Sequence, residues 1–541
     1  MANPQYDFII IGAGSAGCVL ANRLTEDPSV QVLLLEAGCK DTKLEIHVPA
    51  AYGKLNFTKV DWSFWTEPQA NVDNRRMYQP RGKTLGGSSS TNAMAYVRGH
   101  RADYDAWAQG GADGWDYESV LPYFKKSEHN EQFADDFHGR GGELNVTFAQ
   151  QYRTPLADAF VEACVETGIP RTADYNGAQQ EGASPFQFTI KNGKRHSTAA
   201  AFLTPILNRK NLQVVTGAHV RRILIENDRA VGVEILKNGS VDTLKVRREV
   251  LLSAGAFGSP QLLMLSGIGA KDELKRHGIA LKKELAGVGQ NLHDHLMCGM
   301  SSYSTWRGTM NDVLKPMNQV RHFLNFLLKK QGPLTISPLE ANAFVKSDPS
   351  VLQPDWQFFF VPGHMGNDAD KAKGSDVYRP ETYPKVDGFT ILPVLLQPKS
   401  RGYVGLRSAN PLDAPVIQPN YLQHEDDQTA LIAAFRKAKE VMLSAAFEPF
   451  MKDFFYPKRA TSDGEIFQHI KNTLECVYHP VSTCRIGTDD LSVVDARLRV
   501  HGIEGLRVID ASVMPRIVSG NTNAACIMIG EKGADLVKND F

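Results

Sequence analysis

The stretch DFIIIGAGSAGCVLANRL at residues 7–24, followed by VQVLLLEAG at residues 30–38, decides the fold class of this chain. It reads as an apolar strand, a glycine-rich turn, a run with helical spacing and a second apolar strand. Strands that are apolar at nearly every position are typical of a parallel sheet covered on both faces. We therefore predict an α/β, doubly wound domain that begins near the N-terminus.

The turn in this unit, GAGSAG at residues 12–17, has the GxGxxG spacing of dinucleotide-binding folds. The first glycine allows the tight turn, the second lets the backbone approach a pyrophosphate, and the third packs the helix against the strand. The helix N-terminus offers free N–H groups and a partial positive charge to phosphates. Glu36 ends the second strand, 19 residues after Gly17, where a carboxylate can accept hydrogen bonds from ribose hydroxyls. A turn without a ligand is the alternative, but the combination favours a dinucleotide site formed by Gly12, Gly14, Ser15, Ala16, Gly17, Glu36 and Ala37.

The composition is that of an ordinary globular protein with about two domains. The chain has 541 residues, of which 42% are hydrophobic and 22% charged, and its 60 basic and 60 acidic side chains balance. No cluster of Lys and Arg indicates a nucleic-acid partner. The seven cysteines are scattered and form no CxxC pair, which argues against a disulfide framework or a zinc site.

The uncharged run at residues 8–22 is the one candidate for a targeting or membrane segment. It follows Asp7 rather than a basic cluster, contains three glycines, and is shorter than the roughly 20 residues that a membrane helix needs. We therefore expect a cytoplasmic protein, and we leave open a peripheral contact with the inner face of the membrane.

The rest of the chain indicates two interleaved domains. Residues 39–104 have little periodicity and are expected to be extended chain, whereas residues 117–127 and 155–167 have helical spacing. Short apolar runs at residues 356–361, 388–395 and 402–406 are typical of antiparallel sheet. We predict a nucleotide-binding domain from residues 1–155, 192–300 and 470–541, and a second, antiparallel-sheet domain from residues 156–191 and 301–469.

Two long motifs carry a family resemblance. GKTLGGSSSTN at residues 82–92, continued through Tyr96 and Gly99, and GAFGSPQLLMLSGIG at residues 255–269 resemble the two signatures of the glucose-methanol-choline (GMC) oxidoreductases. They occur in the expected order, and the resemblance extends from Asp7 to Val537. It implies the GMC fold (α/β, α+β overall), in which a Rossmann-like FAD-binding domain is interleaved with an antiparallel-sheet substrate domain. Members of this family bind FAD and oxidise alcohols, sugars or choline.

The first signature also makes physical sense beside a flavin. Consecutive glycines and serines let the backbone pass close under a flat ring, and their N–H and hydroxyl groups can stabilise negative charge on it. Thr91 stands where some choline-oxidising relatives carry a His bonded to the flavin, so the resemblance implies FAD held without a covalent link. It also implies an adenine contact at Val220 and a contact with the ribityl and phosphate chain at Asp510. The implied cofactor residues beyond the first turn are Gly82, Leu85, Gly86, Gly87, Ser88, Ser90, Thr91, Asn92, Ala93, Val220, Ala254, Gly255, Asp510, Ala511, Asn521 and Thr522.

Two segments near the C-terminus, YHPVSTCR at residues 478–485 and GNTN at residues 520–523, resemble the segments that hold the catalytic pair of the family. The resemblance assigns the pair to His479 and Asn521. A neutral imidazole, with a reference pKa of about 6.5, can take the hydroxyl proton of an alcohol, and an amide can donate a hydrogen bond to the developing alkoxide. We further expect Tyr478, Trp62 and Glu340 to line the substrate pocket, although a packed Tyr478 and a structural hydrogen bond for Glu340 are open alternatives.

The motifs most resemble those of bacterial choline, aliphatic-alcohol and polyethylene-glycol dehydrogenases. The resemblance implies that an alcohol loses a proton to the protein and a hydride to flavin N5, giving an aldehyde or ketone, and that the electrons pass to a quinone or other acceptor. An oxidase that uses oxygen is the nearest alternative, and a lyase or a photodecarboxylase is a more remote one. NLHDH at residues 291–295 has the composition of a metal cluster, but relatives carry Gln at position 293 and bind no metal there, so we expect no metal site. The substrate, the acceptor and the oligomeric state stay open.

Overall fold

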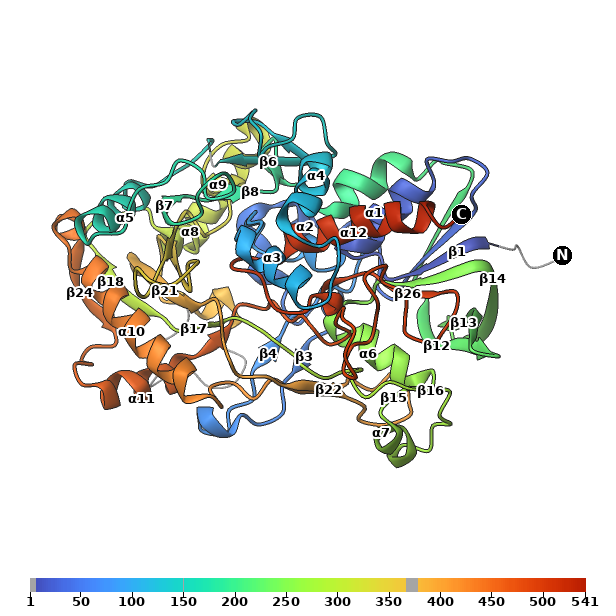
Figure 1. The fold of residues 1–541 in the computed structure, drawn as a ribbon. Helices are drawn as coiled ribbons and strands as arrows, with labels where there is room; N and C mark the ends of the chain where they lie inside the picture. The colour runs from blue at the N-terminus through green and yellow to red at the C-terminus, as the bar shows by residue number, and fades with distance from the viewer. Residues whose placement is uncertain (1–5, 149, 366–377) are drawn as a thin grey trace.

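A computed structural model describes residues 6–148, 150–365 and 378–541 and contains two large sheets, one at each end of the molecule (Figure 1). The first sheet has seven strands in the order β11-β2-β1-β14-β13-β12, and β26 also pairs with β14. Pairing is parallel between β11, β2, β1, β14 and β26 and antiparallel between β14, β13 and β12. These strands are β1 (Tyr6–Ile11), β2 (Val32–Glu36), β11 (Leu212–Thr216), β12 (His219–Glu226), β13 (Arg229–Lys237), β14 (Ser240–Leu252) and β26 (Leu506–Val508).

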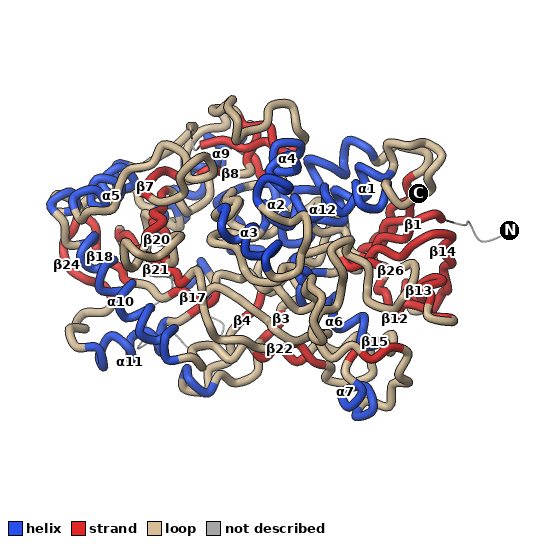
Figure 2. Tube along the Cα trace, viewed as in Figure 1, coloured by secondary structure: helices blue, strands red, loops and turns tan. Residues whose placement is uncertain are grey.

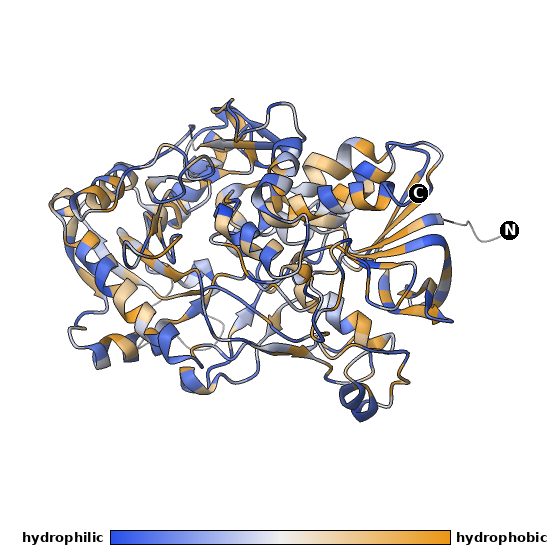
Figure 3. Ribbon diagram, viewed as in Figure 1, coloured by the Kyte–Doolittle hydropathy of each residue, from blue (hydrophilic) through white to orange (hydrophobic). Residues whose placement is uncertain are grey.

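The predicted strand–turn–helix–strand unit is confirmed: α1 (Ser15–Leu24) follows β1 and leads to β2. Every residue of β1 and β2 is buried, and in Figure 3 β1 turns from a hydrophilic start to a hydrophobic ribbon. A Cβ at Gly17 would lie 1.9 Å from the carbonyl oxygen of Gly12, so only glycine lets the helix pack this close to the turn.

The second sheet is antiparallel, as predicted, and has eight strands. Six follow the order β24-β18-β21-β20-β19-β7, β17 pairs with β21, and β25 pairs with β17. Buried residues of α5 (Pro155–Glu166), α10 (Glu425–Met442) and α11 (Asp463–Thr473) form one apolar core with this sheet. The strands are β7 (Gly182–Pro185), β17 (Leu296–Met297), β18 (Met300–Ser304), β19 (Ala341–Val345), β20 (Trp356–Val361), β21 (Gly388–Leu395), β24 (Met451–Tyr456) and β25 (Glu475–Cys476).

Two short strands belong to a different sheet from the one that the predicted domain ranges imply. β17 and β25 fall within the ranges assigned to the nucleotide-binding domain, yet they pair with each other and β17 pairs with β21 of the second sheet. The chain therefore passes between the two sheets close to residues 296 and 475. In the structure the second sheet begins a few residues before position 301 and ends a few residues after position 469.

Loops and short elements fill the space between the two sheets (Figure 2). The stretch at residues 39–104 contains only short pieces, and an isolated bridge joins Cys39 to Thr84. A small sheet of β5, β6 and β8 lies beside helix α4. These elements are α2 (Leu44–His47), β3 (Phe64–Trp65), β4 (Tyr78–Gln79), α3 (Arg101–Gln109), α4 (Tyr117–Ser127), β5 (Glu128–Asn130), β6 (Leu144–Phe148) and β8 (Gln187–Phe188), and α6 (Gly255–Leu265) and α7 (Lys271–Arg276) follow β14.

The two ends of the chain close the first sheet together. α12 (Asn523–Lys538) packs along α1, and the start of β1 and the end of α12 lie on the same side of the molecule (Figure 1). The Arg23 guanidinium on α1 lies 2.7 Å from the buried Glu531 carboxylate on α12 and 2.6 Å from that of Glu143. Among the residues in view, no helix is both long and apolar enough to cross a membrane.

Candidate active site

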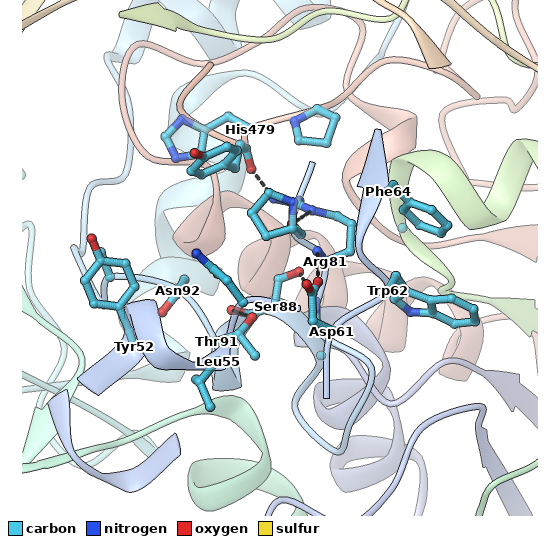
Figure 4. A pocket seen from close by; sticks show the side chains of 18 of the residues that line it. Tyr52, Leu55, Asp61, Trp62, Phe64, Arg81, Ser88, Thr91, Asn92 and His479 are labelled. Atoms are coloured by element: carbon cyan, nitrogen blue, oxygen red, sulfur yellow. Dashed lines mark hydrogen bonds between the residues drawn. The ribbon is translucent and has the colours of Figure 1, made fainter. Parts of the chain in front are cut away.

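A cavity of about 720 Å³ lies between the two sheets and is lined by residues of both. Figure 4 shows part of its lining, with Trp62, Thr91 and His479 among the labelled residues. One end is formed by the glycine-rich turn after β1 and by the end of β2. The other end is formed by strands β17 and β20 of the second sheet and by the segment around His479. The cavity is therefore long enough to bring the predicted dinucleotide site and the predicted catalytic pair into one space.

Two glycine-rich loops that are far apart in the sequence meet in the wall of this cavity. The Gly86 N–H donates a hydrogen bond of 2.7 Å to the carbonyl oxygen of Ala13, and a Cβ at Gly87 would lie 2.8 Å from the Cα of Gly14. A Cβ at Gly14 would meet nothing within 4 Å, so backbone at the N-terminus of α1 is open to the cavity. Such bare backbone beside a helix N-terminus fits a phosphate-bearing cofactor.

Glu36 lies in the cavity wall at the end of β2. Its two carboxylate oxygens accept hydrogen bonds from the N–H groups of Ala13, at 2.9 Å, and Gly38, at 2.7 Å. Burial raises the pKa of Glu36 to about 7. Each oxygen has a second lone pair, so the carboxylate can hold the turn in shape and still accept from the hydroxyls of a ribose.

Asp510 organises the helix that starts beside the turn. Its Oδ2 accepts from the Gly255 N–H at 2.9 Å and from Ser259 Oγ at 2.5 Å, which fixes the first turn of α6. Ser15 Oγ donates to Asn523 Oδ1 at 2.6 Å and so links the N-termini of α1 and α12. The starts of three helices therefore converge on the cavity.

Most of the predicted cofactor residues line the cavity, and four lie behind its wall. Ser90 Oγ donates to the carbonyl oxygen of Leu85 at 2.7 Å, and Gly86 has a φ of +84°, so these residues shape the loop from behind. Those behind the wall are Gly17, Leu85, Gly86 and Ser90. Those in the lining are Gly12, Gly14, Ser15, Ala16, Glu36, Ala37, Gly82, Gly87, Ser88, Thr91, Asn92, Ala93, Val220, Ala254, Gly255, Asp510, Ala511, Asn521 and Thr522.

His479 and Asn521 lie next to each other in the cavity wall, with 3.3 Å between Asn521 Nδ2 and His479 Nε2. The other ring nitrogen, His479 Nδ1, lies 2.9 Å from Nδ1 of His295. His295 Nε2 lies 3.1 Å from the carbonyl oxygen of Leu396, which can only accept, so this nitrogen carries the proton of the neutral His295 ring. His295 Nδ1 is then an acceptor and His479 Nδ1 the donor, which leaves the lone pair of His479 on Nε2, the nitrogen that faces Asn521.

Burial keeps both rings neutral. Burial lowers the pKa of His295 to about 3, and burial together with the neighbouring His295 and Arg81 lowers the pKa of His479 well below its ordinary value. His479 is therefore a neutral base throughout the neutral pH range, and its Nε2 lone pair accepts from Asn521 Nδ2 at the cavity wall.

The turn that carries His479 is strained and is held from both sides. Tyr478 has a φ of +62°, a backbone conformation that is rare for residues other than glycine. Arg81 Nη2 donates to the carbonyl oxygen of Tyr478 at 2.5 Å, and the His479 N–H donates to Asp294 Oδ1 at 2.8 Å. Tyr421 donates to the other oxygen of Asp294 at 2.9 Å. These bonds fix the direction in which the imidazole points.

The second-sheet side of the cavity is apolar. Eleven of the lining residues belong to one apolar cluster, and the Tyr478 side chain also lines the cavity. The eleven are Ala93, Met94, Ala95, Met297, Met310, Leu339, Phe359, Val361, Met365, Leu392 and Val477.

Of the residues expected in the substrate pocket, Trp62 lines the cavity and Glu340 does not. The Trp62 ring lines the cavity but lies 6.0 Å from the ring of His219, next to Val220, at the end where the adenine is expected. Glu340 is buried outside the cavity lining, and its Oε2 accepts from the N–H and hydroxyl of Thr154 at 2.9 and 2.7 Å, where α5 begins. Its role is the structural hydrogen bond.

The histidines of the NLHDH run are committed to hydrogen bonds within the protein. His293 Nε2 lies 2.7 Å from the carbonyl oxygen of Pro398, and its Nδ1 accepts from the Ile517 N–H at 3.2 Å. Elsewhere in the described chain, Asp135, His138 and Asp174 bring potential metal ligands together. His138 lies between the carboxylates of Glu128 and Asp174, and these hydrogen bonds raise its pKa to about 9, so the cationic ring already satisfies both.

Comparison with known proteins assigns the chain to a family. The sequence profiles of the GMC oxidoreductases match residues 6–297 and 398–530. The chain belongs to the GMC oxidoreductase family. Among curated relatives of this GMC oxidoreductase, an alcohol dehydrogenase [acceptor] of Pseudomonas putida is 44% identical over 98% of this chain and 96% of its own. The mitochondrial choline dehydrogenase of Homo sapiens is 44% identical over 99% of this chain and 90% of its own.

Solved structures agree with the GMC fold. The pyridoxine 4-oxidase from Mesorbium loti has a TM-score of 0.88 at 30% identity, covering 99% of each chain. A variant of the Aspergillus oryzae formate oxidase has a TM-score of 0.92 at 28% identity, covering 100% of this chain and 99% of the other. GMC oxidoreductases use FAD, and the open glycine-rich cradle and Glu36 fit that cofactor.

Sequence reasoning missed three residues that hold the catalytic loop of this GMC oxidoreductase: Asp294, His295 and Arg81. Asp294 and His295 belong to the NLHDH run, whose composition drew attention as a metal cluster and not as a partner of His479. The signal that could have found them is a cluster of titratable residues, His293, Asp294 and His295, that needs hydrogen-bond partners if it is buried. Nothing local to Arg81 indicates that it contacts a residue almost 400 positions away.

Proposed function

We propose that this GMC oxidoreductase is an FAD-dependent alcohol dehydrogenase that converts a CH–OH group to an aldehyde or ketone. The observation that carries the proposal is the unprotonated Nε2 of His479, which lies in the cavity wall and accepts from the Asn521 amide at 3.3 Å. A substrate hydroxyl bound between these two groups can give its proton to Nε2 while the Asn521 amide donates a hydrogen bond to the same oxygen. Asp294, Arg81 and His295 hold the imidazole in place for this step.

Bound FAD would accept the hydride from the substrate carbon. Gly14, Gly87 and the N-terminus of α1 would hold its pyrophosphate, Glu36 its ribose hydroxyls, and Val220 its adenine.

Thr91 lines the cavity and carries no imidazole that could bond to a flavin carbon, which supports non-covalent attachment. Acid or heat precipitation should release all the flavin into the supernatant, and yellow colour in the protein pellet would contradict this.

We propose an uncharged, largely apolar alcohol as the substrate. The second-sheet side of the cavity is formed by the apolar cluster described above, and Glu340 does not reach it. Glu475 is the acidic residue of β25 in the lining, and Arg75 Nη2 contacts its carboxylate at 2.8 Å, which balances its charge. No unbalanced carboxylate among the described lining residues of this side is available to hold a quaternary ammonium.

The electron acceptor is proposed to be a quinone or another organic acceptor. The support is the likeness over nearly the full length to the Pseudomonas putida alcohol dehydrogenase [acceptor]. If the reduced enzyme is instead reoxidised by oxygen in aerated buffer at the rate of turnover, an oxidase is the correct assignment.

The test is anaerobic flavin reduction with a series of primary n-alkanols and with choline. Alkanols should bleach the flavin and choline should do so far more slowly; the reverse order would overturn the substrate class.

His479→Ala should stay folded and yellow but reduce its flavin at least about a hundredfold more slowly, since general bases typically contribute 10²–10⁴-fold. A control, His424→Asn, keeps a residue that can cap α10 and should react like the parent. Reduction of His479→Ala at close to the parent rate would refute the mechanism.

A further inference from the structure

Helix α9 (Pro316–Lys329) presents an apolar face to solvent instead of burying it. Met317, Val320, Leu324, Leu327 and Leu328 are 45 to 87% exposed, and their spacing places them on one side of the helix. Phe326, on the opposite side, is buried and attaches the helix to the protein. A surface helix of a globular protein ordinarily has the reverse arrangement, so this face needs a partner.

The charges around this face identify the chemistry of the partner. Residues 315–330 contain four basic side chains, Lys315, Arg321, Lys329 and Lys330, and no acidic one. Lys315 pairs with Asp312 at 2.7 Å, while Arg321 and Lys329 are exposed. An apolar face with basic residues beside it matches a bilayer with anionic headgroups. Two copies of this helix would instead bring like charges together.

The helix is also continuous with the wall of the cavity. α8 (Met310–Val313) ends three residues before α9 begins, and Met310, Asn311 and Leu314 line the cavity. A surface on which α9 rests would therefore lie next to the α8 wall of the active site.

We propose that α9 is a membrane-docking helix. It lies in the plane of an anionic bilayer, with Met317, Leu324 and Leu328 in the boundary between headgroups and acyl chains and with Arg321 and Lys329 at the phosphates. Its 14 residues are too few to span a bilayer, which takes about 20. Docking places the α8 side of the cavity at the membrane, and this inference does not depend on the proposed function.

The test is flotation of the purified holoenzyme with phosphatidylcholine vesicles, with and without phosphatidylglycerol. The parent should float with the anionic vesicles and less with the neutral ones. Met317→Gln/Leu324→Gln/Leu328→Gln should bind at least about tenfold more weakly, since transfer of apolar surface drives such docking. Arg321→Gln/Lys329→Gln should lose the preference for anionic vesicles, as should the parent in about 1 M salt, where the Debye length is about 3 Å.

The matched control is Leu352→Gln/Leu443→Gln, which removes two exposed leucines outside α9 and should bind like the parent. Because the three α9 side chains are exposed, the triple variant should keep the parent's rate with a soluble electron acceptor. A parent that does not float with either kind of vesicle would overturn the proposal, and so would a triple variant that floats as well as the parent. A parent dimer that the triple substitution dissociates would also overturn it, because the face would then belong to a second copy.

Discussion

At the scale of single residues, the reactivity of His479 is set by what surrounds it. The ring has one nitrogen engaged by His295 and the other directed to Asn521, and burial favours its neutral form. An exposed imidazole would be half protonated at about pH 6.5. Here protonation requires more acid, because the charged form loses more from burial than the neutral form.

This shift predicts the pH dependence of flavin reduction. The neutral ring is the base, so the rate should be constant at and above about pH 6.5 and should fall only at lower pH. Stopped-flow reduction with a saturating alkanol between pH 5 and 9 tests this. A half-maximal rate at or above pH 6.5 would contradict the role of burial.

His295 is predicted to be a positioning residue. His295→Leu removes the acceptor for His479 Nδ1–H, so the His479 ring is no longer held as the tautomer with an unprotonated Nε2. Flavin reduction should slow by about tenfold or more while the FAD content stays unchanged. Loss of a hydrogen bond that orients a histidine at a metal site has an effect of about this size. His295→Gln, whose amide oxygen can accept the same bond, should recover part of the rate. Equal losses in both variants would indicate a packing role only.

At the scale of elements, the cofactor cradle depends on the contact between two turns. Gly87→Ala would place a Cβ 2.8 Å from the Gly14 Cα, and the turns would have to separate. We expect FAD affinity to fall by about tenfold or more, the equivalent of about 1.4 kcal/mol. Gly114 also has a positive φ but open space around its Cβ position, so Gly114→Ala carries the backbone cost alone. Flavin retained through gel filtration measures both variants, and equal retention would refute the contact as the cause.

The elements show what sequence patterns can and cannot supply. β1, α1, α4, β20 and β21 follow from apolar periodicity because each is defined by its own residues. The contact between His295 and His479 joins residues 184 apart, and no local pattern encodes it. The contact between the Trp62 and His219 rings likewise joins distant parts of the chain, so the surroundings of Trp62 could not be predicted locally.

At the scale of the whole molecule, two apolar cores are joined through one cavity. Residues of both cores pack beside the space where FAD is expected, so the cofactor should stabilise both parts. A ligand at a thousandfold excess over its Kd adds about 4 kcal/mol. Removal of FAD should therefore lower the Tm of the whole chain by calorimetry. A transition of the second core that does not shift would contradict this coupling.

The packing of α1 against α12 means that α1 is synthesised long before its partner helix. α1 ends at Leu24, whereas α12, whose Glu531 holds Arg23, ends at Lys538. At about 5–20 residues per second, a ribosome needs roughly 25–100 s to make the chain between these two points. For most of that time the nascent β1–α1–β2 unit has one apolar surface uncovered. We expect the emerging chain to depend on holding chaperones, and a nonsense codon before Glu531 to send nearly the whole product to proteolysis.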